Sequence, residues 1–113
     1  MRTLTDVEFQ ELVADFYSES SDDVVGLWEV AKVVEKLIET GDVAREQSLR
    51  IVRALLAKGL LVGDPPYSAN GYKPWPDQNP ERVVSRIEAE WLELGHTPSI
   101  PDIAWFGRPG WEC

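Results

Sequence analysis

Carboxylates crowd the first quarter of the chain, and their spacing is the clearest chemical pattern in the sequence. Spacings of three, four and four residues place four of them on one face of a helix, and two more follow directly. The set consists of Glu8, Glu11, Asp15, Glu19, Asp22 and Asp23. Two interpretations stay open: a surface that imitates phosphate and docks on a basic protein, or a solvated face that keeps the chain soluble.

The only segment with a positive balance of charge lies between residues 41 and 63. Its polar side chains could read DNA, because arginine and glutamine recognise the edges of guanine and adenine in the major groove. The residues that would do so are Arg45, Gln47, Arg50 and Arg53. The alternative is a solvated helix with internal ion pairs, since Glu46 precedes Arg50 by four residues.

Residues that could carry catalysis or bind a metal are scarce. His96 is the single histidine and Cys113 the single cysteine. The sequence has no nucleophile elbow, phosphate-binding loop, dinucleotide fingerprint or His-Glu-x-x-His motif. We therefore expect a protein that is not an enzyme and has no catalytic residue, metal or cofactor.

Tryptophans offer a third kind of candidate. Trp75 between two prolines, Trp105 beside Phe106, and Trp111 could anchor an interface, because aromatic residues dominate binding hot spots. They could equally fill gaps between a tail and a small core. Trp28 and Trp91 lie in helical patterns, and we expect both in the core.

Composition limits the classes of protein that fit. The 113 residues suit a single domain spanning 1–113, and 43% hydrophobic with 27% charged residues is a globular balance. The net charge of −9 repels nucleic acid and anionic lipid, which argues against nonspecific binding of either. No apolar run is long enough for a membrane span, and a lone cysteine suits the reducing cytoplasm.

Three helices should position the charged residues. Thr5 and Glu8 form a capping box that predicts a first helix from residue 5, with an apolar stripe through Phe16. A second helix is expected over 27–39 and a third over 43–58. Between them, Gly41 should cap the end of the second helix and Asp42 the start of the third. The second helix should turn Leu37 and Ile38 inward.

The remaining elements are a hairpin, a fourth helix and a tail. Strands are expected over 60–62 and 72–75, the latter at a sheet edge because of Pro74. Asn79 and Pro80 predict the start of the fourth helix and Gly95 its end, with Leu94 on the inner face. Residues 103–106 are too apolar for water and should fold back onto the core in extended form.

These elements together predict an α+β fold, mainly α: three helices, a β-hairpin wing, a fourth helix and an apolar C-terminal tail. One core should bury residues from every helix together. The residues chosen to represent it are Phe16, Val34, Leu56 and Trp91.

Two stretches resemble known families. Three segments of the first half resemble winged-helix domains of bacterial regulators. They are Trp28-Glu29-Val30-Ala31, Ala44-Arg45-Glu46-Gln47-Ser48-Leu49-Arg50 and Leu55-Leu56-Ala57-Lys58-Gly59-Leu60-Leu61. This implies that the third helix is a recognition helix that leads into a wing. The second half resembles small bacterial proteins of unassigned function, some of which serve as immunity partners of polymorphic toxins. The resemblance lies in Glu90-Trp91-Leu92-Glu93-Leu94-Gly95, Pro98 and Ile103-Ala104-Trp105-Phe106.

The favoured hypothesis is a non-enzymatic, cytoplasmic protein-binding module with an acidic helix face and a basic partner, such as a toxin or nuclease. Its specific form is an immunity- or antitoxin-like factor. The acidic first helix and a wing whose only base is Lys73 argue against DNA reading. The alternative is a DNA-binding transcriptional regulator that reads DNA with helix 43–58 as a homodimer. A third hypothesis is a small adaptor within a larger assembly.

Overall fold

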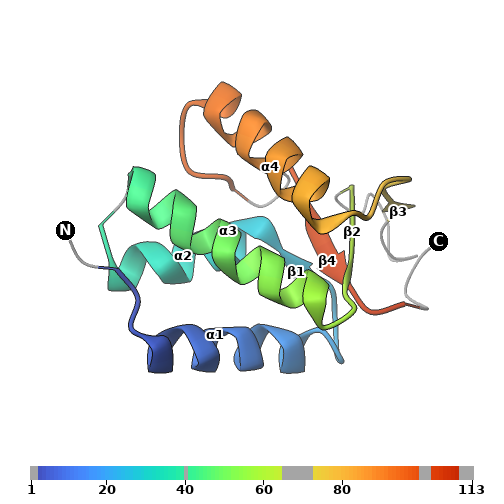
Figure 1. Cartoon of the computed structure of the whole chain (residues 1–113), viewed down its shortest axis with the longest axis horizontal. Coiled ribbons are helices and arrows are strands. Elements are labelled where there is room, and N and C mark those ends of the chain that lie inside the picture. The colour runs from blue at the N-terminus through green and yellow to red at the C-terminus, as the bar shows by residue number, and fades with distance from the viewer. Residues whose placement is uncertain (1–2, 40, 65–72, 100–102, 110–113) are drawn as a thin grey trace.

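The fold is α+β and mainly helical. The computed structural model describes residues 3–39, 41–64, 73–99 and 103–109 (Figure 1). Within them the chain forms four helices and a four-stranded antiparallel sheet. The elements in order are α1 (Asp6–Glu19), β1 (Val25–Gly26), α2 (Leu27–Leu37), α3 (Asp42–Ala57), β2 (Leu61–Asp64), β3 (Lys73–Pro74), α4 (Pro80–Leu94) and β4 (Trp105–Gly107).

The ends of α1 and α4 follow local sequence signals, as predicted. The Glu8 amide donates to Thr5 Oγ1 at 3.1 Å, and the Thr5 amide donates to Glu8 Oε1 at 2.9 Å, so the capping box is complete. Asn79 Oδ1 accepts from the first amides of α4, and Gly95 ends that helix at φ +79°. These bonds satisfy backbone donors that have no partner within the helix.

The turn between α2 and α3 differs from the prediction. Helix α2 stops at Leu37, and Ile38 leaves it in extended form so that its side chain reaches the core. Leu37 was predicted to face inward, but it is 39% exposed. The predicted roles of Gly41 and Asp42 were wrong too: Gly41 is the N-cap of α3, at φ +144°, and Asp42 is its first residue. The burial of Ile38 therefore overrides the helix periodicity.

Helix α3 is the central helix and packs against α1, α2 and α4 (Figure 1). Its buried face includes Ile51, Val52 and Leu55, none of which is exposed. Ser48 is also fully buried, and its hydroxyl donates to the Ala44 carbonyl at 2.8 Å. The predicted core is confirmed, because one cluster contains Phe16, Val34, Leu56 and Trp91.

The sheet has the order β1-β4-β2-β3. The predicted hairpin is present, since β2 pairs with β3, and Pro74 lies in the edge strand as expected. The tail does extend and pack, but β4 enters between β1 and β2, which the sequence analysis did not anticipate. Phe106 lies opposite Val25 on one side and Val62 on the other, and it is fully buried.

Local packing constrains the residues next to β4 and within β1. Arg108, just after β4, donates from Nη2 to the Tyr17 carbonyl at 2.8 Å and from Nε to Ser20 Oγ at 3.1 Å. A cation at these last carbonyls of α1 is favoured by the helix dipole. At β1, a Cβ on Gly26 would lie 2.5 Å from Cδ1 of Trp28, so glycine is required there. Trp28 was predicted to be core, but it is only half-buried.

Removing the Phe106 ring tests the central position of β4. Phe106→Ala should lower the free energy of unfolding by about 3–5 kcal/mol, because the cavity would lie between two strand partners and the helices. Phe106→Leu should cost less. Leu92→Ala, at a side chain 57% exposed on α4, is the matched control and should change stability by less than about 0.5 kcal/mol. Urea unfolding measures all three, and equal midpoints for Phe106→Ala and Leu92→Ala would contradict the placement of β4.

Candidate functional site

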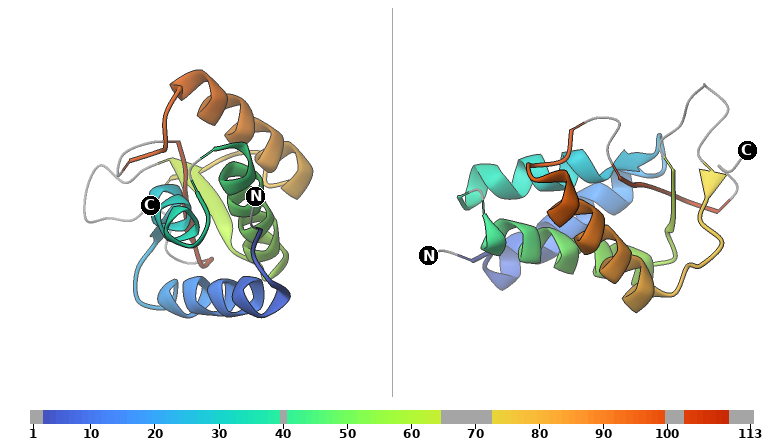
Figure 2. Two further views of the ribbon diagram at one scale, coloured as in Figure 1. Left: turned by 90° about the vertical axis from the view of Figure 1, so that its left-hand side faces the viewer. Right: turned by 90° about the horizontal axis from the view of Figure 1, so that it is seen from above.

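The acidic residues of α1 lie on the outside of the fold. We call Glu8, Glu11, Asp15, Glu19, Asp22 and Asp23 the acidic face. All are exposed except Glu8, which is half-buried. Helix α1 forms one edge of the molecule, and its other side packs on α3 (Figures 1 and 2). The helical spacing therefore predicted the exposure of these carboxylates correctly.

Members of the acidic face differ in what they contact. Glu8 belongs to the capping box, and Asp23 Oδ1 accepts from the Val24 amide at 2.8 Å. Glu11, Asp15 and Asp22 form no ion pair with any residue that the structure describes. These three carboxylates remain available to a cation from outside the molecule.

The acidic face continues to the start of α2 through Glu29. Burial raises the pKa of the Glu29 carboxyl, and the nearby carboxylates of Glu19 and Asp23 raise the pKa further. The Gly26 amide donates to Glu29 Oε2 at 2.9 Å, which lowers the pKa in part. No sequence pattern points to Glu29, because its proximity to Glu19 depends on how α1 and α2 pack.

Arg50, a candidate for reading DNA, lies against α1. Its guanidinium carbon is 3.9 Å from the centroid of the Phe9 ring, and its Nη2 atom is 3.9 Å from Asp6 Oδ1. A guanidinium over an aromatic face is stabilised by the charge distribution of the ring. Arg50 thus contributes to packing between α3 and α1.

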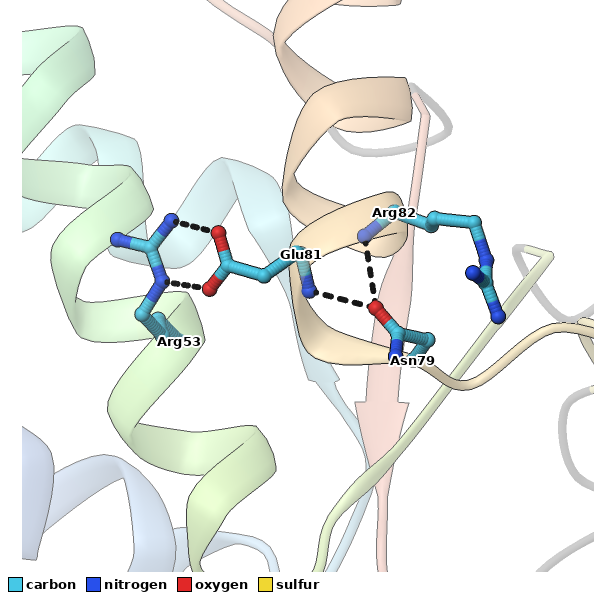
Figure 3. Close-up of polar contacts among 4 residues, drawn as sticks. All are labelled: Arg53, Asn79, Glu81 and Arg82. Atoms are coloured by element: carbon cyan, nitrogen blue, oxygen red, sulfur yellow. Dashed lines mark hydrogen bonds and ion pairs between the residues drawn. The ribbon is translucent and has the colours of Figure 1, made fainter.

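Arg53 forms an ion pair with a residue of α4 (Figure 3). Its Nε and Nη2 atoms donate to the two carboxylate oxygens of Glu81 at 3.0 and 3.1 Å. Such bidentate pairs fix both side chains in direction. Glu81 is itself placed by the Asn79 cap, because its amide donates to Asn79 Oδ1 (Figure 3).

The last two candidates for reading DNA, Arg45 and Gln47, are half-buried near the start of α3. Arg45 Nη1 lies 2.9 Å from Asp42 Oδ1. Arg45 Nε and Gln47 Oε1 are buried and have no hydrogen-bond partner in the part of the chain described. All three arginines of α3 therefore have a carboxylate neighbour within the protein.

Trp75 was a candidate for partner binding, and the structure places it in the core at 4% exposed. Its Nε1 atom donates to Asp64 Oδ1 at 2.9 Å, and the Arg86 guanidinium lies 3.5 Å from the ring centroid. Trp75 thus fills a gap beneath the hairpin and is not part of an exposed surface. Trp105 is half-buried in β4, whereas Trp111 and Cys113 lie outside the described residues.

A small pocket of about 260 Å³ lies where three helix ends meet. Its lining includes Glu35 of α2, Asp42 and Arg45 of α3, and His96 and Thr97 after α4. His96 is exposed, and its Nδ1 atom lies 2.9 Å from the Thr97 carbonyl oxygen. No sequence pattern points to this pocket, because its walls come from distant segments.

Neither a metal-binding cluster nor a membrane-spanning helix occurs among the described residues. Residues 3–39, 41–64, 73–99 and 103–109 contain no group of three or more histidine, cysteine or acidic side chains arranged to hold a metal ion. No helix in those same segments has the length and apolar character that a membrane crossing requires. Comparisons of the chain with protein-family models, with curated proteins and with solved structures find no match.

The pKa of Glu29 makes stability depend on pH. A carboxyl whose pKa is raised on folding stabilises the folded state when protonated, so this contribution is lost as pH rises from about the ordinary value of 4.5 through the raised pKa. Glu29→Gln removes the charge and can still accept from the Gly26 amide. The free energy of unfolding of Glu29→Gln minus that of the unmodified protein should therefore increase between pH 4 and pH 7.

Glu11→Gln is the matched control, because Glu11 is exposed on α1 and has no ion-pair partner among the described residues. It removes one carboxylate from the same side of the molecule at an exposed side chain, so it separates the effect of burying Glu29 from the effect of losing one negative charge. Urea unfolding at several pH values measures both variants. A Glu29→Gln difference that stays constant from pH 4 to pH 7 would show that Glu29 titrates normally.

Proposed function

We propose that the protein is a non-enzymatic binding module of the cytoplasm that docks on a basic protein through its acidic face. The observation that carries this proposal is an imbalance in charge pairing. Glu11, Asp15 and Asp22 have no cation near them among the described residues, whereas Arg45, Arg50 and Arg53 each lie beside a carboxylate. Within α1 and α3, the charged side chains left without an ion pair to a described residue are therefore acidic.

The electrostatics of association support a basic partner. A cluster of carboxylates on the edge of a protein with net charge −9 attracts cations over distances up to roughly a Debye length, which speeds encounter with a basic surface. Such a cluster resembles the phosphates of a nucleic acid. The partner class we propose is a basic toxin or nuclease, for which this protein would act as an immunity- or antitoxin-like factor.

For the scaffold, we propose a winged-helix type. The order of α1, β1, α2, α3, β2 and β3 supports it, since the third helix leads directly into a hairpin. The intrusion of β4 between β1 and β2 is an addition to that plan. In this proposal the helix that would read DNA has become an internal helix.

Charge reversal on α1 tests the function. The double variant Glu11→Lys and Asp15→Lys should lose capture of basic proteins from a lysate of the source cells. With a captured protein in hand, its association rate at low salt should fall about tenfold, because exposed charges act mainly by steering. The variant should fold, since both side chains are exposed and the change relieves repulsion. Mass spectrometry of the captured proteins and stopped-flow kinetics at two salt concentrations are the measurements.

The matched control is Glu39→Lys with Glu93→Lys, which changes net charge equally at exposed sites away from α1. It should keep most of the capture. Equal losses in both double variants would mean that net charge alone matters, and the acidic face would not be the docking surface. Sequence-selective DNA binding that is abolished by Arg50→Ala and unaffected by the α1 variant would establish the DNA-reading alternative instead.

A further inference from the structure

A groove of about 540 Å³ runs along α2, beside the segment that follows α4. Its lining comes from one face of α2 and from the segment 97–99. The residues are Trp28, Lys32, Glu35, Lys36, Thr97, Pro98 and Ser99. The volume is within the range of pockets that bind small molecules.

The groove carries positive charge that no described residue neutralises in an ion pair. Lys32 and Lys36 are exposed, one helical turn apart, and neither forms an ion pair with a described residue. By contrast, all five arginines of α3 and α4 have a carboxylate within ion-pair distance. Glu35 is the one acid among the described lining residues, and its Oε2 atom accepts from the Thr97 hydroxyl at 2.6 Å.

The groove also has a fixed apolar wall. The Trp28 indole lies over Gly26, in space that a Cβ would occupy, and it stays half-exposed beside the lysines. Lys32 Nζ lies over that indole, 5.8 Å from its centroid, so an ammonium group and an apolar surface are presented side by side. Pro98 is buried and forms part of the opposite lining.

We propose that this groove is a binding site for a small amphipathic anion. The apolar body of the ligand lies against Trp28 and Pro98, and its acidic group lies between the ammonium groups of Lys32 and Lys36. Lysine pairs as a point charge with carboxylate, sulfonate or phosphate, so the shared chemistry is an anionic group on a compact apolar body. The site uses α2 and is independent of the acidic face on α1.

The probe is 8-anilinonaphthalene-1-sulfonate, titrated by fluorescence against the intact protein. The double variant Lys32→Gln and Lys36→Gln should weaken its binding about five- to tenfold, as expected for two exposed ion pairs. The neutral analogue N-phenyl-1-naphthylamine, which lacks the sulfonate, should bind both proteins equally. Lys73→Gln on β3 is the matched control, because it removes an exposed lysine outside the groove, and it should leave sulfonate binding unchanged.

Competition then identifies the acidic group. Both 1-naphthaleneacetate and 1-naphthyl phosphate should displace the probe, and the stronger of the two indicates a carboxylate or a phosphate ligand. Uncharged 1-naphthalenemethanol should displace it poorly. Chemical shifts of the Trp28 indole N–H should move with the same midpoint as the fluorescence, and near-UV circular dichroism should confirm that each variant is folded.

Three results would overturn the proposal: equal sulfonate binding in the double variant, equal displacement by the uncharged alcohol, or unmoved Trp28 shifts at saturation. The charge-reversal variant of Glu11 and Asp15 should bind the probe like the unmodified protein. A failure of the groove is therefore distinguishable from a failure of the acidic face.

Discussion

The structure depends on the burial of α3 against three other helices at once. Side chains such as Ile51, Val52 and Leu55 each gain about 1.5–3 kcal/mol when removed from water, and no other helix has so many neighbours to provide that burial. Because α3 is surrounded in this way, its polar residues lie at the boundaries between α3 and the neighbouring helices. Arg50 over Phe9 and Arg53 against Glu81 are the result, because a long side chain at such a boundary packs its stem along one helix while its charged head reaches the next.

Features set by short-range chemistry were predictable from the sequence. The Thr5 capping box, the Asn79 cap and the end of α4 at Gly95 all depend on residues within one helical turn of each other. The position of β4 did not follow from any local pattern, since its partners in β1 and β2 are far away along the chain. The end of α2 was missed for a related reason: the core site that buries Ile38 is made by other elements.

The candidate sites divide in the same way. Helical periodicity was enough to place Glu11 and Asp15 on the outside of α1, because exposure on an amphipathic helix follows from its apolar stripe. The partner of Arg53 lies 28 residues further along, in α4, and no pattern in α3 reveals it. The groove beside Trp28 was not predicted, for two reasons. This indole was expected in the core, and one wall of the groove comes from residues after α4.

The central position of β4 also determines when, during synthesis of the chain, the sheet can form. Helices α1, α2 and α3 can begin to pack as soon as they leave the ribosome, because their contacts join segments made one after another. Strands β1 and β2 cannot join one sheet until residues 105–107 emerge, since β4 is the strand between them. Until then the nascent chain carries two open strand edges and an uncovered apolar face, which are the features that chaperones recognise and that promote association between growing chains.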